Sequence, residues 1–84
     1  MKVFDNGSLF TVTVFQREVQ QFKSQWPGSG LIDKAVSFMF DKQTGDLVEI
    51  FGKQADGPAL AALSIDAMNY GIDRLALPKT LKRK

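Results

Sequence analysis

The chain has 84 residues, enough for a single domain, and it contains neither cysteine nor histidine. This composition excludes disulfides, thiol nucleophiles and thiolate or imidazole metal sites, and it removes the commonest general base. The formal net charge is +2, but four of the eleven cations fall among the last six residues, which leaves residues 1–78 with seven positive and nine negative charges.

A short N-terminal ribbon is the first expected element. The dipeptide Asn-Gly at positions 6–7 is a strong hairpin signal. It separates two candidate strands, residues 2–4 and 8–12, of which the second is rich in β-branched and aromatic side chains and is the more secure.

A helix is expected to follow this ribbon. Thr13 is a suitable N-cap, and Gln16 three positions later would complete a capping box. Pro27 disfavours helical geometry in the residue before it, so the helix should end there. A stripe of apolar residues at helical spacing predicts the core-facing side: Phe15, Val19, Phe22 and Trp26.

Residues 35–51 predict a second hairpin, with Gly45 in the left-handed conformation of its loop. The preferred register sets Phe38 against Ile50, whereas a register shifted by one residue would set it against Glu49. The preferred register has these pairs: Lys42–Asp46, Phe40–Val48 and Phe38–Ile50. It places one apolar set on the core side: Val36, Phe38, Phe40, Val48 and Ile50.

A second helix is expected after the hairpin. Asp56 is a plausible N-cap, and Pro58 suits the first turn because its missing donor costs nothing there. Gly71 predicts the end of the helix as a left-handed cap. Residues 72–78 can dock on the domain through Ile72, Leu75 and Leu77, and a solvated tail is expected from Pro78 onward.

The element order β-α-β-β-α predicts an α+β two-layer domain. It would contain a three-stranded sheet, with or without the extra N-terminal β-ribbon, and both helices on one face. Residues 1–78 are assigned to one globular domain and residues 79–84 to a flexible basic tail. No apolar run approaches the ~20 residues that cross a bilayer, and the first residues lack a signal-peptide pattern, so we expect a cytoplasmic protein without a membrane partner.

The sequence offers no convincing catalytic or metal-binding group. Asp41 and Asp46 flank one turn but lack the carboxylate spacing of a calcium loop. Ser29 and Ser64 have no neighbour that suggests an activating base. Residues 28–30 could form a small anion nest, although a turn that ends the helix is the more typical reading. We therefore expect no enzyme activity, no metal and no cofactor.

Two apolar surfaces are candidates for protein binding. The sheet face opposite the helices is open unless the ribbon or residues 72–78 cover it, and it would expose Met39, Leu47 and Phe51. The last helix carries a second apolar stripe, which the same segment or a partner could cover: Ala61, Ile65 and Met68. These six residues predict a protein partner, or a second copy in a homodimer.

The basic C-terminus supports an alternative function in nucleic-acid binding. Its four cations are Lys79, Lys82, Arg83 and Lys84. If all four contacted duplex phosphates, the salt dependence of binding would have a slope of about −3.6. Basic termini also serve solubility, so both readings stay open at this point.

Six segments carry a resemblance to a known group of proteins. They are residues 26–31 (Trp-Pro-Gly-Ser-Gly-Leu), 38–41 (Phe-Met-Phe-Asp), 45–49 (Gly-Asp-Leu-Val-Glu), 56–63 (Asp-Gly-Pro-Ala-Leu-Ala-Ala-Leu), 66–67 (Asp-Ala) and 70–71 (Tyr-Gly). Together they resemble a family of small uncharacterised proteins encoded by bacteriophages, plasmids and other mobile elements. The resemblance implies a biological context and no particular chemistry. The leading hypothesis is a non-catalytic accessory protein of a mobile element that acts by protein binding, for example as an inhibitor of a host system.

Overall fold

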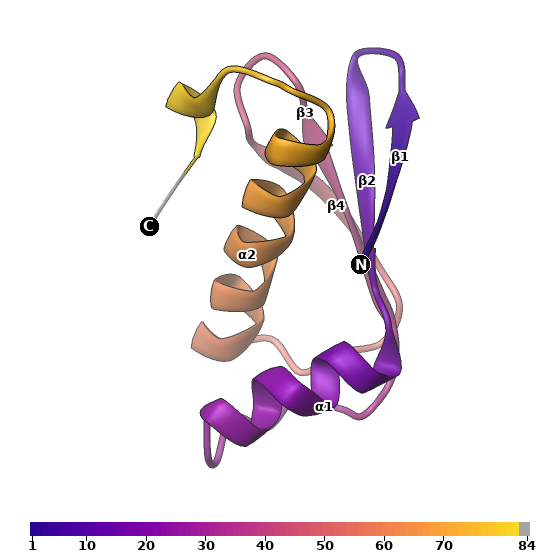
Figure 1. Ribbon diagram of the computed structural model, residues 1–84. Coiled ribbons are helices and arrows are strands. Elements are labelled where there is room, and N and C mark those ends of the chain that lie inside the picture. Colours follow the sequence, from indigo (N-terminus) through magenta and orange to yellow (C-terminus); the bar gives the residue numbers. More distant parts are fainter. Residues whose placement is uncertain (83–84) are drawn as a thin grey trace.

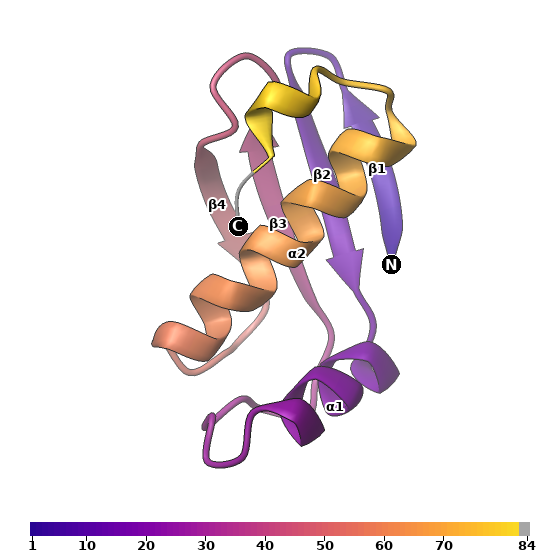
Figure 2. The same ribbon diagram turned by 60° about the vertical axis from the view of Figure 1, so that its left-hand side comes forward.

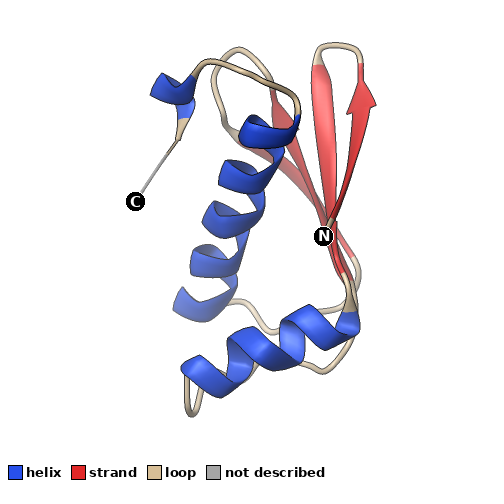
Figure 3. Ribbon diagram, in the orientation of Figure 1, coloured by secondary structure: helices blue, strands red, loops and turns tan. Residues whose placement is uncertain are grey.

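The strands of the protein form one antiparallel sheet in the order β1-β2-β3-β4 in the computed structural model, which describes residues 1–82 (Figures 1 and 3). The elements are β1 (Lys2–Asn6), β2 (Leu9–Val14), α1 (Gln16–Gln25), β3 (Val36–Asp41), β4 (Leu47–Phe51), α2 (Pro58–Arg74) and one 3₁₀ turn, η1 (Lys79–Leu81). The predicted α+β class is confirmed. The optional ribbon is part of the sheet as β1, so the sheet has four strands.

α2 covers one face of the sheet, and α1 lies across the end of the sheet on the same side (Figures 1 and 2). β2 and β3 flank α1 in the chain and are antiparallel neighbours, so α1 is an excursion within a long hairpin. Side chains of β2, β3 and α2 supply most of the core: Phe10, Val12, Val14, Val19, Leu31, Val36, Phe38, Phe40, Ala59, Leu60, Leu63, Ala67, Met68 and Ile72. Within the described residues, no helix combines the length and apolarity that a membrane span requires.

The first hairpin forms where the Asn-Gly signal predicts it. Asn6 pairs with Leu9, which leaves a two-residue loop with Gly7 at a φ of +73°. A positive φ at the first loop position is the conformation that glycine supplies in tight hairpins. Both strands extend further than the sequence indicates, because β1 continues past residue 4 to Asn6 and β2 continues past residue 12 to Val14.

The predicted start of the first helix at Thr13 is wrong, because β2 continues through Val14. Thr13 pairs with Ser37 on β3, and the two hydroxyl oxygens lie 2.8 Å apart. The N-cap is instead Phe15, whose backbone N–H donates to Glu18 Oε1 at 3.0 Å. A carboxylate in the first turn satisfies one of the free donors of a helix N-terminus. The helix ends before Pro27, as predicted.

The aromatic stripe of α1 is only partly in the core. Val19 is fully buried and Phe22 is half-buried. Phe15 and Trp26 at the two ends of the helix are 46% and 41% exposed, so the prediction that the whole stripe is buried is wrong for them. The sheet end supports only the middle of the helix, and Trp26 stacks on Phe22 with ring centres 5.8 Å apart.

The second hairpin follows the preferred register only up to a bulge. Gly45 has a φ of +73°, and Phe38 pairs with Ile50, as predicted. Phe40, however, pairs with Leu47 instead of Val48, because Val48 is an extra residue on β4. The prediction that Val48 belongs to the core is therefore wrong, and its side chain is 53% exposed.

α2 begins at Pro58 and continues beyond its predicted end. The N-cap is Gly57 and not Asp56. Gly71 lies inside the helix, where it allows close contact with Phe10 of β2, so its predicted role as the C-terminal cap is wrong. The left-handed residue at the end of α2 is Ala76, with a φ of +53°.

The chain after α2 folds back onto the domain. Leu75 and Leu77 pack against the core, as the sequence predicts for residues 72–78. The first part of the expected tail is also in contact with the domain, because η1 places Leu81 against the core and beside Gly45. Residues 83–84 of that expected tail lie outside the described residues.

Candidate functional site

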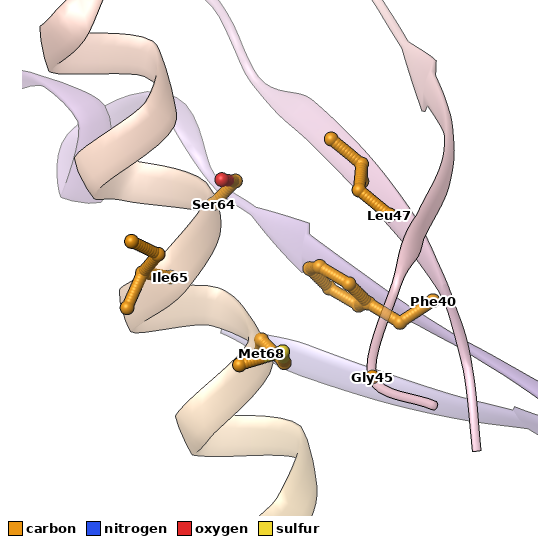
Figure 4. A pocket seen from close by; sticks show the side chains of 6 residues that line it. All are labelled: Phe40, Gly45, Leu47, Ser64, Ile65 and Met68. Atoms are coloured by element: carbon orange, nitrogen blue, oxygen red, sulfur yellow. The ribbon is translucent and has the colours of Figure 1, made fainter. Parts of the chain in front are cut away.

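A small groove lies between α2 and the β3–β4 hairpin, near the point where Leu81 of η1 lies beside Gly45. Its cavity measures about 50 Å³. One wall belongs to α2 and the other to the β3–β4 hairpin (Figure 4), with these lining residues: Phe40, Gly45, Leu47, Ser64, Ile65 and Met68. The Ser64 hydroxyl donates to the carbonyl of Ala61 at 2.6 Å, and the other side chains in the lining are apolar.

Leu47 reaches this groove because of the bulge in β4. In a regular strand Leu47 would share a face with Glu49, which pairs with Met39 on the opposite side of the sheet. The extra residue Val48 interrupts this alternation and places Leu47 on the same side as Phe40. The prediction that Leu47 belongs to the outer face is therefore wrong.

The structure brings together three of the predicted protein-binding residues. Leu47 is 43% exposed and Ile65 is half-buried, and both line the groove. Met68 forms part of the same lining but is only 2% exposed, so it supports the groove from below. Ala61 lies one turn before Ile65 on α2 and is exposed.

Met39 and Phe51 are separate from the groove, on the outer face of the sheet. Phe51 is 44% exposed and Met39 is half-buried. The strand register adds Phe4, 43% exposed, to the same face. Among residues 1–82 neither of the two expected covers lies over this face, because β1 is an edge strand of the sheet, and Leu77 with its neighbours packs on the α2 side.

β4 is the more apolar of the two edge strands. Its sequence Leu-Val-Glu-Ile-Phe has one charge, whereas β1 carries Lys2 and Asp5. The exposed fractions of Leu47, Val48 and Phe51 are 43%, 53% and 44%. α2 packs against β2 and β3 and leaves β4 at the margin. An apolar edge with an uncovered side is a template for pairing with another chain.

The predicted nucleic-acid-binding cations are not gathered on one described surface. Lys79 is exposed at the start of η1. Lys82 forms an ion pair with Asp73 near the end of α2, with 2.6 Å between Nζ and Oδ1. Arg83 and Lys84 lie outside the described residues. The described part of the tail therefore contributes one cation without an ion pair.

The acids and the glycine turn have local structural roles. Asp41 Oδ1 accepts hydrogen bonds from the backbone N–H groups of Gln43 and Thr44 at 2.7 and 3.1 Å, which shapes the β3–β4 turn. The backbone N–H of Ser29 donates to the Trp26 carbonyl at 3.0 Å in the turn that ends α1. Within residues 1–82, no group of three or more acidic side chains could hold a metal ion.

The fold and the groove define a small α+β domain with one apolar edge. Comparisons with protein-family models, with curated proteins and with solved structures find no match for this chain.

Proposed function

We propose that this chain is a small non-catalytic accessory protein that acts by binding protein, and that it self-associates through β4 and the adjoining groove. The observation that carries the proposal is the exposure of β4. Leu47, Val48 and Phe51 are all more than two-fifths exposed on a five-residue edge strand with a single charge. Isolated exposed apolar residues are common on any protein, but three of them on one short edge strand mark an interaction surface.

Antiparallel pairing of two β4 strands would give hydrogen-bond partners to the edge backbone and would bury its apolar side chains. Backbone N–H and C=O groups at the edge would bond across a two-fold axis, so that the sheet continues into the second copy. The groove would lie beside the paired strands, because Leu47 belongs to β4 and lines the groove. Burial of each large apolar side chain contributes about 1.5–3 kcal/mol at most.

The resemblance to proteins of mobile elements supplies the setting for this proposal. A protein without catalytic groups can still block a larger assembly when it presents a rigid apolar edge. Inhibition of a host system is the form of protein binding that this setting favours. The proposal rests on the resemblance for the setting and on β4 for the mode of binding.

Binding of nucleic acid by the basic tail has less support. One of its cations, Lys82, is already paired with Asp73. The remaining described cation, Lys79, gives too little positive charge for a phosphate-binding patch.

The proposal is tested by measuring the solution mass with light scattering at low and high salt. We expect a dimer that high salt does not dissociate, because apolar burial and backbone pairing are not screened by ions. Val48→Lys places a charge on the paired edge and should give a monomer. Val48 is 53% exposed, so this change should leave the fold intact.

Phe4→Lys is the matched control, because Phe4 is 43% exposed on the opposite edge strand and lies far from the groove in the sheet order. It should remain dimeric. A monomeric wild-type protein, or a dimer that only Phe4→Lys dissociates, would contradict the proposal. A mass that rises only when duplex DNA is added at low salt would favour the tail instead.

A further inference from the structure

A second and larger cavity lies between the last turns of α2 and the start of β1, at the opposite edge of the sheet from the groove. Its volume is about 340 Å³. The residues that line it are Met1, Lys2, Val3, Tyr70, Arg74 and Leu75. Cavities of ~300–1,000 Å³ that combine apolar walls with a few polar groups are typical of small-molecule sites.

The two charged side chains among these lining residues are both cations. The Arg74 guanidinium lies 5.8 Å from the centre of the Tyr70 ring, and the Lys2 ammonium lies 5.2 Å from the centre of the Phe4 ring. Within residues 1–82 neither cation forms an ion pair with a carboxylate. Arg74 is therefore free to meet an anion from solution, whereas Lys2 shares the outer face of the sheet with Phe4 and points away from α2.

The acids nearest to the cavity are engaged elsewhere. Glu18 receives the ammonium of Met1 at 2.5 Å. Asp73, next to Arg74 in the chain, is paired with Lys82. Among the lining residues, these ion pairs leave Arg74 as the unpaired charge beside the cavity.

Backbone acceptors that could repel an anion are also occupied. The Ile72 carbonyl accepts from the backbone N–H of Leu77 at 3.0 Å, and the Asp73 carbonyl accepts from Ala76 at 3.4 Å. The Tyr70 hydroxyl donates to the Met1 carbonyl at 3.2 Å, which holds the ring against the N-terminal strand. The wall beside Arg74 is therefore fixed, and its carbonyls have partners.

We propose that this cavity binds a small organic anion, a carboxylate or a phosphate monoester on an apolar body. The guanidinium of Arg74 takes the anionic head, since its planar donors match the paired oxygens of either group. Val3 and Leu75 provide apolar contacts for the body of the ligand. The inference does not depend on the self-association proposed for β4.

The test uses phenyl phosphate and benzoate as probes, with inorganic phosphate as the head group alone, and follows backbone amide shifts by NMR. We expect at least one aromatic probe to bind with a dissociation constant on the order of 1 mM, and inorganic phosphate to bind more weakly. The shifts should be confined to the cavity, at residues such as Val3, Tyr70 and Leu75. The aromatic probe with the lower dissociation constant identifies the preferred head group.

Arg74→Gln should weaken binding by about tenfold, the effect of one charge-assisted hydrogen-bonded contact. Lys2→Gln should leave binding nearly unchanged, because the Lys2 ammonium lies over Phe4 on the outer face of the sheet. Arg17→Gln is the matched control, because Arg17 is an exposed cation on α1 outside the cavity. Thermal unfolding of each variant verifies that it is folded.

Three results would overturn the inference. The first is that neither aromatic probe produces shifts at the cavity. The second is that Arg74→Gln binds as well as the wild type, and the third is that Arg17→Gln loses as much affinity as Arg74→Gln. The last result would show diffuse attraction to positive charge instead of a site.

Discussion

Gly71 is the residue at which α2 comes closest to the sheet. A Cβ atom at this position would lie 2.5 Å from Cε2 of Phe10 and 3.0 Å from Cγ2 of Val12. Phe10 is fully buried, so its ring cannot yield without disturbing the core. We expect Gly71→Ala to lower the free energy of unfolding by about 1–3 kcal/mol, measured by chemical denaturation. At an exposed helical position the same change would raise stability by about 1 kcal/mol, so a more stable variant would contradict this close packing.

Asp5 and Lys42 join the two hairpins at one end of the sheet. A hydrogen bond from the Lys42 ammonium holds the pKa of Asp5 below its ordinary value. A lowered pKa in the folded state means that this contact stabilises the fold above the ordinary pKa of Asp, about 3.9, and that the contribution is lost as the pH falls through the lowered value.

We expect Lys42→Gln to raise the pKa of Asp5 toward its ordinary value, because the donor of the charged hydrogen bond is gone. NMR titration of the Asp5 carboxyl carbon measures this change. Lys53→Gln removes the same charge outside this contact and should leave the titration unchanged. If both variants shift it equally, general charge and not the hydrogen bond sets the pKa.

At the scale of elements, the end of α2 carries a strain that can be removed. Ala76 has a φ of +53°, and the Leu77 N–H bonds to the Ile72 carbonyl at 3.0 Å, the arrangement that usually has glycine in the left-handed position. Ala76→Gly should raise the free energy of unfolding by up to about 1 kcal/mol. Ala61→Gly, at an exposed position within α2, should lower it by about as much. Thermal or chemical unfolding of the two variants should show changes of opposite sign.

The elements that the sequence predicts correctly are those with local signals. Gly7 and Gly45 mark the two tight turns, and Pro27 and Pro58 mark helix ends, because backbone geometry at these residues depends on the residue itself. The wrong predictions involve long-range contacts. Thr13 could cap a helix, but pairing with β3 keeps it in a strand. Nothing in the chain next to Gly71 reveals the Phe10 ring that makes a glycine necessary there.

In the candidate groove, too, the sequence predicts what depends on local signals and misses what depends on long-range contacts. Helical periodicity identifies Ile65 as part of a second apolar stripe on α2. Its meeting with Leu47 depends on the extra residue Val48 in β4, and a bulge of this kind has no local sequence signal in this chain. Leu47, which the sequence assigns to the outer face of the sheet, therefore lies on the α2 side in the same groove as Ile65.

At the scale of the whole molecule, the architecture leaves both edges of the sheet available. One long helix lies over the middle strands of a four-stranded sheet, so β1 and β4 lie at its margins. Each margin forms a different kind of site. The β4 side has an apolar groove without charged lining, and the β1 side has a cavity with Lys2 and Arg74. Protein binding and anion binding could then occur together, because α2 separates the two sites.

The register of the proposed β4 pairing can be tested directly, because the chain has no cysteine. A two-fold axis through Glu49 would set two like charges opposite each other, which is unfavourable. An axis through Ile50 sets this residue against its own copy and moves each Glu49 opposite a Phe51. Residues that face each other across the axis have Cβ atoms about 4.5–5.5 Å apart, close to disulfide geometry.

Ile50→Cys should therefore form a disulfide-linked dimer under mild oxidation, and Glu49→Cys should cross-link much more slowly. Non-reducing gels over a time course compare the two rates. Faster cross-linking of Glu49→Cys would place the axis at Glu49, against the charge argument. Equal rates would mean that the two strands have no fixed register. Backbone pairing requires a fixed register, so the apolar groove would then be the principal source of association.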